Sequence, residues 1–249
     1  PNPEIFEALR LGLELAEKSG ADLMLATDPD ADRVGIAMKC PDGSYELVSG
    51  NEVGVLLLDY ICAGRMEKGT MPEKAVAVKS IVSTPLADAV AANYGVELRS
   101  VLTGFKWIGD QIAQLETAGE VERFIFGFEE SCGYLIGSYV RDKDAVGAAM
   151  LICEMADTYK SIGKTLVDVL KDLYRTYGRY KSELKNYAFE GTEAQRRMRY
   201  IRKSLAEKPE MKMRGSRVLR YQDYLEGIDE LPKADVIKLW MEDGSEVVI

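Results

Sequence analysis

The pattern of apolar and polar residues predicts alternating helices and strands along most of the chain. Apolar residues recur at helical spacing from Ile5 to Ala16, and Asn2-Pro3 before them is a typical helix start, with Asn2 as the cap. Short apolar runs between turn residues predict strands at 22–27, 34–38, 45–48, 75–78, 96–102 and 123–128. Further helices are predicted at 51–65 with Asn51 as cap, and at 85–94, 107–117, 144–159 and 164–177.

This alternation predicts an α/β fold with a largely parallel or mixed sheet. Polar, glycine-containing loops follow the strands, and ligands of open α/β sheets bind at the carboxyl ends of strands. After about residue 175 the pattern changes. Strands predicted at 182–189, 218–221, 236–241 and 247–249 outnumber the one helix predicted at 192–206, so a smaller α+β domain is expected there.

Composition and charge narrow the class of protein. The 249 residues are 47% hydrophobic and 29% charged, which is typical of a globular protein. A net charge of −9 argues against a nucleic-acid partner. No apolar run is long enough to span a bilayer and no signal peptide opens the chain, so no membrane partner is expected. Four cysteines without a Cys-x-x-Cys pair indicate reduced thiols in a cytoplasmic protein.

The sequence contains no histidine. This excludes serine and cysteine hydrolases that depend on histidine, and zinc sites with histidine ligands, within these residues. Proton transfer must therefore use carboxylates, lysine, tyrosine or cysteine.

The strongest chemical signal is the acidic loop, Thr27 to Arg33, between two apolar strands. Its carboxylates alternate at Asp28, Asp30 and Asp32, and alternate residues of an extended segment point the same way. Three like charges on one side repel each other unless a cation lies among them. Mg²⁺ prefers such oxygen ligands, and Arg33 is suited to a phosphate oxygen beside the metal.

Three other interpretations of the acidic loop compete with a metal site. A solvated acidic turn seldom follows so apolar a strand. An EF-hand needs glycine at its sixth position and glutamate at its twelfth, where this chain has Arg33 and Lys39. A magnesium-dependent phosphatase with an aspartate nucleophile remains open, because an apolar strand leads directly into Asp28-x-Asp30.

A second polar segment, Gly127 to Tyr134, follows the strand predicted at 123–128. It contains two adjacent carboxylates and Ser131, a set of donors and acceptors that suits the hydroxyls of a sugar. Acids that cap a following helix would give the same pattern. This segment alone therefore favours neither a sugar-binding loop nor a loop with capping acids. If it meets a substrate, we expect it to be exposed and mobile at the carboxyl end of a strand.

Four motifs occur in one order along the chain. They are Asp28-x-Asp30-x-Asp32-Arg33, Thr103-Gly104-Phe105-Lys106, Phe128-Glu129-Glu130-Ser131 and Arg141-Asp142-Lys143-Asp144. Together they resemble the α-D-phosphohexomutase superfamily, the phosphoglucomutases and phosphomannomutases, over essentially the whole chain. The acidic and Glu-x-Ser motifs are specific, whereas Thr-Gly-x-Lys alone would be weak.

The resemblance implies a mixed-sheet phosphohexomutase domain with helices on both faces, followed by a smaller partial α+β domain. Residues 1–45 would end the metal-binding second domain. Residues 46–175 would form the sugar-binding third domain, and residues 176–249 would begin the phosphate-binding fourth domain.

The resemblance also implies roles for individual residues. Asp28, Asp30 and Asp32 would bind Mg²⁺. The substrate-binding residues would be Glu129, Ser131, Thr103, Gly104 and Lys106. The catalytic residues would be Lys143 and Arg33, although Lys143 could equally be a surface lysine paired with Asp142 or Asp144.

The activity implied is the interconversion of hexose 1-phosphate and hexose 6-phosphate through a 1,6-bisphosphate and a phosphoserine. The family's Ser-His-Asn-Pro segment cannot occur in a chain without histidine, and its Arg-x-Ser-Gly-Thr loop is also missing. We therefore expect an excised fragment that is inactive alone. The Phe-Glu-Glu-Ser form is most similar to that of phosphoglucomutases and phosphopentomutases. Phosphoglucomutase is the expected activity, while glucose, mannose and ribose phosphates all stay open as substrates.

Overall fold

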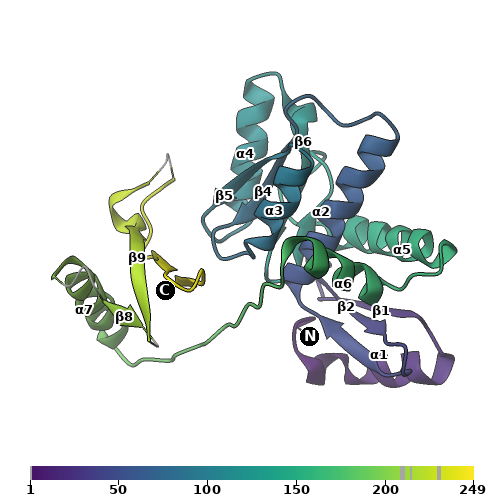
Figure 1. Cartoon of the computed structure of the whole chain (residues 1–249), viewed down its shortest axis with the longest axis horizontal. Helices are drawn as coiled ribbons and strands as arrows, with labels where there is room; N and C mark the ends of the chain where they lie inside the picture. The colour runs from purple at the N-terminus through teal and green to yellow at the C-terminus, as the bar shows by residue number, and fades with distance from the viewer. Residues whose placement is uncertain (1, 208–210, 214, 229–230) are drawn as a thin grey trace. The chain divides into compact units, whose positions relative to one another are not determined.

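The computed structural model describes residues 2–207, 211–213, 215–228 and 231–249. The chain divides into two compact units, Pro1–Ser182 and Glu183–Ile249 (Figure 1). No described helix is long and apolar enough to cross a membrane.

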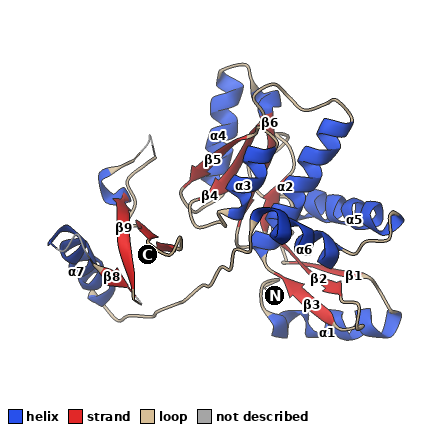
Figure 2. Cartoon of the chain, in the orientation of Figure 1, coloured by secondary structure: helices blue, strands red, loops and turns tan. Residues whose placement is uncertain are grey.

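The first unit is built on a four-stranded mixed sheet (Figure 2). Its strands lie in the order β5 (Glu97–Val101), β4 (Val76–Ser80), β6 (Phe124–Glu129) and β7 (Gly133–Leu135). The first three strands are parallel, and β7 runs antiparallel to β6. The carboxyl ends of β4, β5 and β6 therefore lie at one edge of the sheet.

Helices cover both faces of this sheet. They are α2 (Gly50–Glu67), α3 (Leu86–Asn93) and α4 (Lys106–Thr117). Gly127 of β6 faces Ile108 of α4, while the ring of the next residue, Phe128, lies against Gly54 of α2. Successive strand residues point to opposite faces, so α4 and α2 lie on opposite sides. The expected mixed α/β architecture with two helical layers is confirmed.

A three-stranded antiparallel sheet in the same unit carries the acidic loop. Its strands, in spatial order, are β1 (Leu23–Thr27), β2 (Val34–Lys39) and β3 (Tyr45–Val48). Leu9, Leu13 and Ala16 of α1 (Phe6–Ser19) pack on this sheet. The remaining helices of the unit are α5 (Ala145–Ser161) and α6 (Leu166–Tyr177).

One hydrophobic core joins the two sheets of the first unit. It contains Ile36 of β2, Leu57 of α2, Phe126 of β6 and Ile152 of α5, each at most 1% exposed. The acidic loop is consequently held on the same packed body as the carboxyl ends of the mixed sheet.

The second unit is a small α+β arrangement. Its helix is α7 (Glu193–Glu207), and its antiparallel sheet has the order β11 (Glu246–Val248), β10 (Ile237–Met241), β9 (Ser216–Asp223) and β8 (Lys212–Met213). Leu205 of the helix packs with Val218, Ile237 and Leu239 of the sheet.

Two predicted helix starts were wrong. The predicted caps, Asn2 and Asn51, each form a different hydrogen bond. The first helix begins at Phe6, because Asn2 Oδ1 accepts the backbone N–H of Glu4 and closes a separate turn. The second helix is capped by Ser49 in a capping box with Glu52. Asn51 is buried inside that helix, where its Oδ1 accepts the N–H of Thr84 at 2.8 Å.

The strand predicted at 182–189 was also wrong. This segment has no regular structure, and Leu184 and Tyr187 are 83% and 72% exposed. Its alternating apolar residues have no sheet face to cover, so the pattern alone did not make a strand.

Candidate functional site

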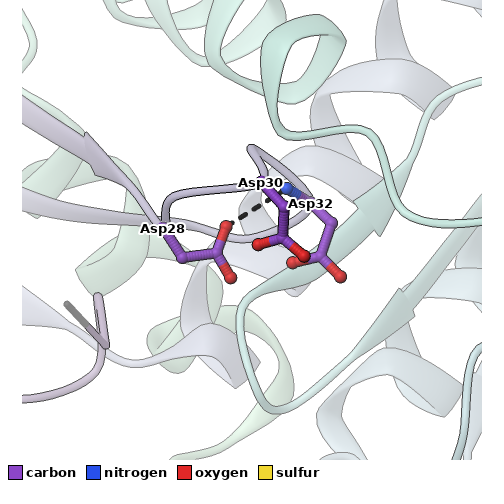
Figure 3. Close-up of side chains that lie close together, drawn as sticks. All are labelled: Asp28, Asp30 and Asp32. Carbon is purple, nitrogen blue, oxygen red and sulfur yellow. Dashed lines mark hydrogen bonds between the residues drawn. The ribbon is translucent and has the colours of Figure 1, made fainter.

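The acidic loop brings its three aspartates together, as their alternation predicted. One carboxylate oxygen from each of Asp28, Asp30 and Asp32 lies within 4.8 Å of the others, and the side chains point the same way (Figure 3). The loop leaves β1 and returns in β2 directly after the Thr27–Val34 pair. This short closure keeps the carboxylates close despite their repulsion.

Asp28 anchors the loop from inside. Its carboxylate is buried and accepts the backbone N–H groups of Asp32 and Arg33, both at 3.1 Å, and Arg33 Nε at 2.8 Å. Burial alone would raise the pKa of Asp28, but the hydrogen bonds from Arg33 lower it to about 2. Asp28 is therefore ionised at neutral pH, and Arg33 is engaged by this carboxylate through its Nε.

The two oxygens of Asp32 differ in their partners. Its Oδ2 lies 2.9 Å from Lys143 Nζ, whereas its buried Oδ1 has no hydrogen-bond partner among the described residues and lies 3.8 Å from Arg33 Nε. Burial and the neighbouring Asp28 raise the pKa of Asp32, against the opposing effect of Lys143. A cation among the three carboxylates would satisfy Oδ1 and relieve this electrostatic cost, so the residues fit a metal ion.

Lys143 contacts three separate segments at once. Its Nζ bonds Asp32 and lies 3.3 Å from Asp142 and 5.5 Å from the ring centre of Phe105. Its aliphatic stem crosses Gly133, where any Cβ would overlap Lys143 Cδ. Lys143 is therefore not a free surface lysine, and its side chain joins the acidic loop to the segment that follows β6.

The charge of Lys143 is set by these neighbours. Burial acts to lower its pKa, but the hydrogen bond to Asp32 and the charge of Asp142 outweigh it and raise the pKa above its ordinary value. Lys143 is consequently protonated at neutral pH. Asp144, the other partner weighed from the sequence, instead caps α5 by accepting the N–H groups of Val146 and Gly147.

The polar segment Gly127 to Tyr134, here called the sugar hairpin, is the end of β6, a turn at 130–132 and β7. The expectation that it is exposed was wrong: Phe128 and Tyr134 are fully buried, and Cys132 is 2% exposed. The hairpin closes against α2, because a Cβ on Gly50 would overlap the carbonyl oxygen of Glu130. Only its turn, with Glu130 and Ser131, is partly exposed.

Glu129 lies at the carboxyl end of β6 and reaches across the sheet edge. It is 5% exposed, and its Oε1 accepts the N–H of Gly104 at 2.6 Å. Gly104 has a φ of 116°, a conformation that favours glycine. Burial raises the pKa of Glu129, more than the Gly104 hydrogen bond lowers it. The structure thus brings together two of the predicted substrate-binding residues, Glu129 and Gly104.

Two further predicted substrate-binding residues, Thr103 and Lys106, are exposed. Thr103 lies in the loop before α4, and Lys106 is the first residue of α4. Lys106 places its Nζ 4.6 Å from the ring centre of Trp107. Lys106 therefore stacks on its neighbour along the helix.

Sequence reasoning missed the groups that support Lys143. The side chain of Lys143 packs against Phe105 and Gly133, yet neither residue was assigned a role in the site. A glycine inside a short strand was the available signal, because it often marks a close approach of another chain segment. Here that segment is the stem of Lys143.

Comparisons with known proteins agree with this arrangement. The sequence pattern of the phosphoglucomutase/phosphomannomutase alpha/beta/alpha domain III matches residues 49–177, and that of alpha/beta/alpha domain II matches residues 1–43. The phosphoglucomutase of Staphylococcus aureus strain MRSA252 is 38% identical over 98% of this chain, and 45% of that relative is covered. The chain thus spans less than half the length of the curated relatives it matches.

Solved structures show the same fold. Parafusin, a phosphoglucomutase from Paramecium, superimposes on the whole chain with a TM-score of 0.69 at 21% identity, over 42% of its own length. A putative phosphomannomutase from Thermus thermophilus covers 98% of this chain with a TM-score of 0.58 at 21% identity, over 46% of its own length. With the family's domain III pattern matching more than half of its residues, this chain belongs to the phosphoglucomutase/phosphomannomutase family.

Proposed function

We propose that this chain forms the metal- and sugar-binding part of an enzyme that interconverts hexose 1-phosphate and hexose 6-phosphate. The observation that carries the proposal is the position of Lys143, whose Nζ is 2.9 Å from Asp32 while its stem lies on Gly133 of the sugar hairpin. In this proposal one site therefore contains the three aspartates that would hold a metal, the protonated Lys143 and the carboxylate of Glu129, which would bind the sugar. Phosphoryl transfer depends on cations that neutralise the developing charge and on groups that position the acceptor, and this site would supply both.

In this proposal Asp28, Asp30 and Asp32 hold Mg²⁺. The Oδ1 of Asp32, which accepts no hydrogen bond from the described residues, and the three converging carboxylates fit such an ion. When bound, Mg²⁺ would neutralise negative charge on the transferring phosphoryl group. Arg33, already bonded to Asp28, keeps that carboxylate ionised and fixed in direction.

Lys143 is the proposed proton carrier. When a phosphoryl group moves between two sugar oxygens through the enzyme, one hydroxyl loses a proton and the other oxygen gains one. Lys143 Nζ is protonated and partly buried, so it can donate a proton or a charged hydrogen bond to the oxygen that loses phosphate. Glu129 and Ser131 would hold ring hydroxyls, since the glutamate accepts and the serine both accepts and donates.

We propose glucose phosphates as the preferred substrates, with mannose and pentose phosphates as the alternatives. The support is the Phe-Glu-Glu-Ser motif at 128–131 and the 38% identity to a phosphoglucomutase. Because the four cysteines are free thiols, the proposal also places the enzyme in the cytoplasm.

The phosphate carrier is proposed to be a serine outside these residues. The Ser-His-Asn-Pro segment of the family needs a histidine, and the sequence has none. We therefore expect no mutase activity from these 249 residues alone. The phosphatase alternative gains no support from the relatives, which are phosphoglucomutases.

The test compares two proteins: these 249 residues alone, and a longer protein that joins them to the remaining parts of a phosphoglucomutase. Conversion of glucose 1-phosphate to glucose 6-phosphate by the longer protein only is the expected result. No turnover of glucose, mannose or ribose phosphates by the longer protein would overturn the proposal. Release of inorganic phosphate by the short chain, lost in Asp28→Asn, would instead support the phosphatase.

A further inference from the structure

The turn of the sugar hairpin is tied to a second loop that has no role in the site described so far. Glu130 Oε2 accepts the hydroxyl of Ser80 at 2.8 Å and lies 3.4 Å from the hydroxyl of Ser83. The two hydroxyls also bond each other at 2.8 Å. Ser80 ends β4 and Ser83 lies in the loop before α3, so one carboxylate joins the ends of two neighbouring parallel strands.

The serine side of this contact is deeply buried. Ser80 is 0% exposed, Ser83 2% and Thr84 4%. Lys79, itself 2% exposed, stabilises the loop between β4 and α3, because its Nζ donates to the carbonyls of Ser83 and Thr84. Asn51 of α2 holds the same loop through the N–H of Thr84. The serines therefore offer Glu130 a fixed attachment point.

Glu129 and Glu130 are adjacent, and their carboxylates bond two different loops. Glu129 bonds Gly104 in the loop after β5, whereas Glu130 bonds Ser80 at the end of β4. Ser131 follows directly in the turn. Because Glu130 lies between Glu129 and Ser131, its hydrogen bonds to the serines restrain the backbone of the turn that carries both.

We infer that Glu130 is a positioning residue for sugar binding: held by Ser80 and Ser83, it fixes the directions of Glu129 and Ser131 without contacting the substrate. This inference rests on the proposed function, because Glu129 and Ser131 are the proposed sugar-binding residues. A carboxylate suits the role, since a charged acceptor forms stronger hydrogen bonds to hydroxyls than a neutral one. Binding groups held by a rigid second layer lose less entropy when the substrate arrives.

The experiment uses the longer protein and glucose 1-phosphate. Glu130→Ala is expected to raise KM and to lower kcat/KM about tenfold, the effect of weakening one hydrogen bond to a charged group. Glu130→Gln keeps an oxygen that can accept from Ser80, and is expected to stay within about threefold of wild type. Ser80→Ala should resemble Glu130→Ala in direction, and Glu122→Gln, an exposed glutamate of the same unit, is the control.

A mutant cycle separates positioning from general destabilisation. If Glu130 acts through Glu129 and Ser131, then Glu130→Ala adds little to an enzyme that already carries Glu129→Gln and Ser131→Ala, whereas independent effects would multiply. Multiplying effects, a kcat/KM for Glu130→Ala equal to that of wild type, or a Glu130→Gln enzyme as impaired as Glu130→Ala would overturn the inference. A wild-type longer protein without mutase turnover would overturn the proposed function instead, so the two failures are distinguishable.

Discussion

The acidic loop and the sugar hairpin both carry carboxylates where a strand ends, β1 in the first and β6 in the second, yet the side chains behave in opposite ways. In the acidic loop, residues 28, 30 and 32 are two apart, and their carboxylates converge within 4.8 Å. In the hairpin, Glu129 and Glu130 are adjacent, and each carboxylate bonds a different loop. In the acidic loop a turn, with Ala31 at a φ of 54°, brings alternate acids to one side, whereas the adjacent acids of the hairpin bond two neighbouring loops.

The two regions also differ in what stabilises their charges. Asp28 is surrounded by N–H donors and Arg33, which lower its pKa to about 2 despite its burial. Glu129 has one backbone donor, so burial dominates and its pKa is raised. Acids that hold a cation must be ionised, and a glutamate that accepts from a sugar hydroxyl forms a stronger hydrogen bond when it is ionised.

Lys143 contacts both regions, so its replacement is expected to have the largest effect. Lys143→Met in the longer protein should lower kcat by roughly 100- to 10,000-fold, the usual contribution of general acid–base catalysis. The measurement is steady-state turnover of glucose 1-phosphate, with Lys171→Met, an exposed lysine, as the control. Unchanged kcat would show that Lys143 only neutralises Asp32.

Removing one carboxylate from the acidic loop is the next strongest perturbation. Asp30→Asn should weaken Mn²⁺ or Mg²⁺ binding by at least about a hundredfold, since even residues behind a metal ligand contribute 10- to 100-fold. Isothermal titration of the longer protein measures this, with Asp157→Asn as the exposed control. Equal metal affinities for Asp30→Asn and wild type would show that the acidic loop does not bind the metal through Asp30.

The matching change in the hairpin is Glu129→Gln, which keeps the shape of the side chain but removes its charge. We expect kcat/KM to fall roughly ten- to a hundredfold, the value of one hydrogen bond to a charged group. Metal affinity should stay as in wild type, because Glu129 is not among the three converging carboxylates. Unchanged kinetics would show that the sugar site lies elsewhere.

The sequence was sufficient for the acidic loop because the relevant contacts are local. Asp28, Asp32 and Arg33 bond one another within five residues of chain. The paired state of Lys143 could not be decided from sequence, since Asp32 lies far from it along the chain and Asp142 beside it. Local spacing therefore predicted which aspartates converge, and only the structure showed that Lys143 forms an ion pair with one of them.

The burial of the hairpin could not be predicted for the same reason. Its turn is covered by Gly50 and fastened to Ser80, both tens of residues earlier in the chain. The alternation of helices and strands did predict the mixed sheet, because periodicity reflects which face is buried. The strand expected at 182–189 failed because its exposed residues have no facing layer.

The smallest expected effect concerns stability and pH in the acidic loop. Unfolded aspartate titrates near pH ~4, whereas Asp28 in the folded chain has a pKa of about 2. The folded state therefore binds fewer protons in this range. The ionised Asp28 stabilises the fold fully above about pH 5, and this contribution, about 2 kcal/mol, is lost as the pH falls through about 2.

Asp28→Asn removes this titration. In metal-free buffer we expect the variant to be less stable than the parent at pH 7, with the difference shrinking as the pH falls towards 2. Urea unfolding followed by fluorescence measures it in a Trp240→Phe background, so that Trp107 reports only the unit that carries the acidic loop. Asp157→Asn, exposed in the same unit, is the control. A difference for Asp28→Asn that stays constant from pH 7 to pH 2 would mean that packing, and not the ionised carboxylate bonded to Arg33, holds this loop together.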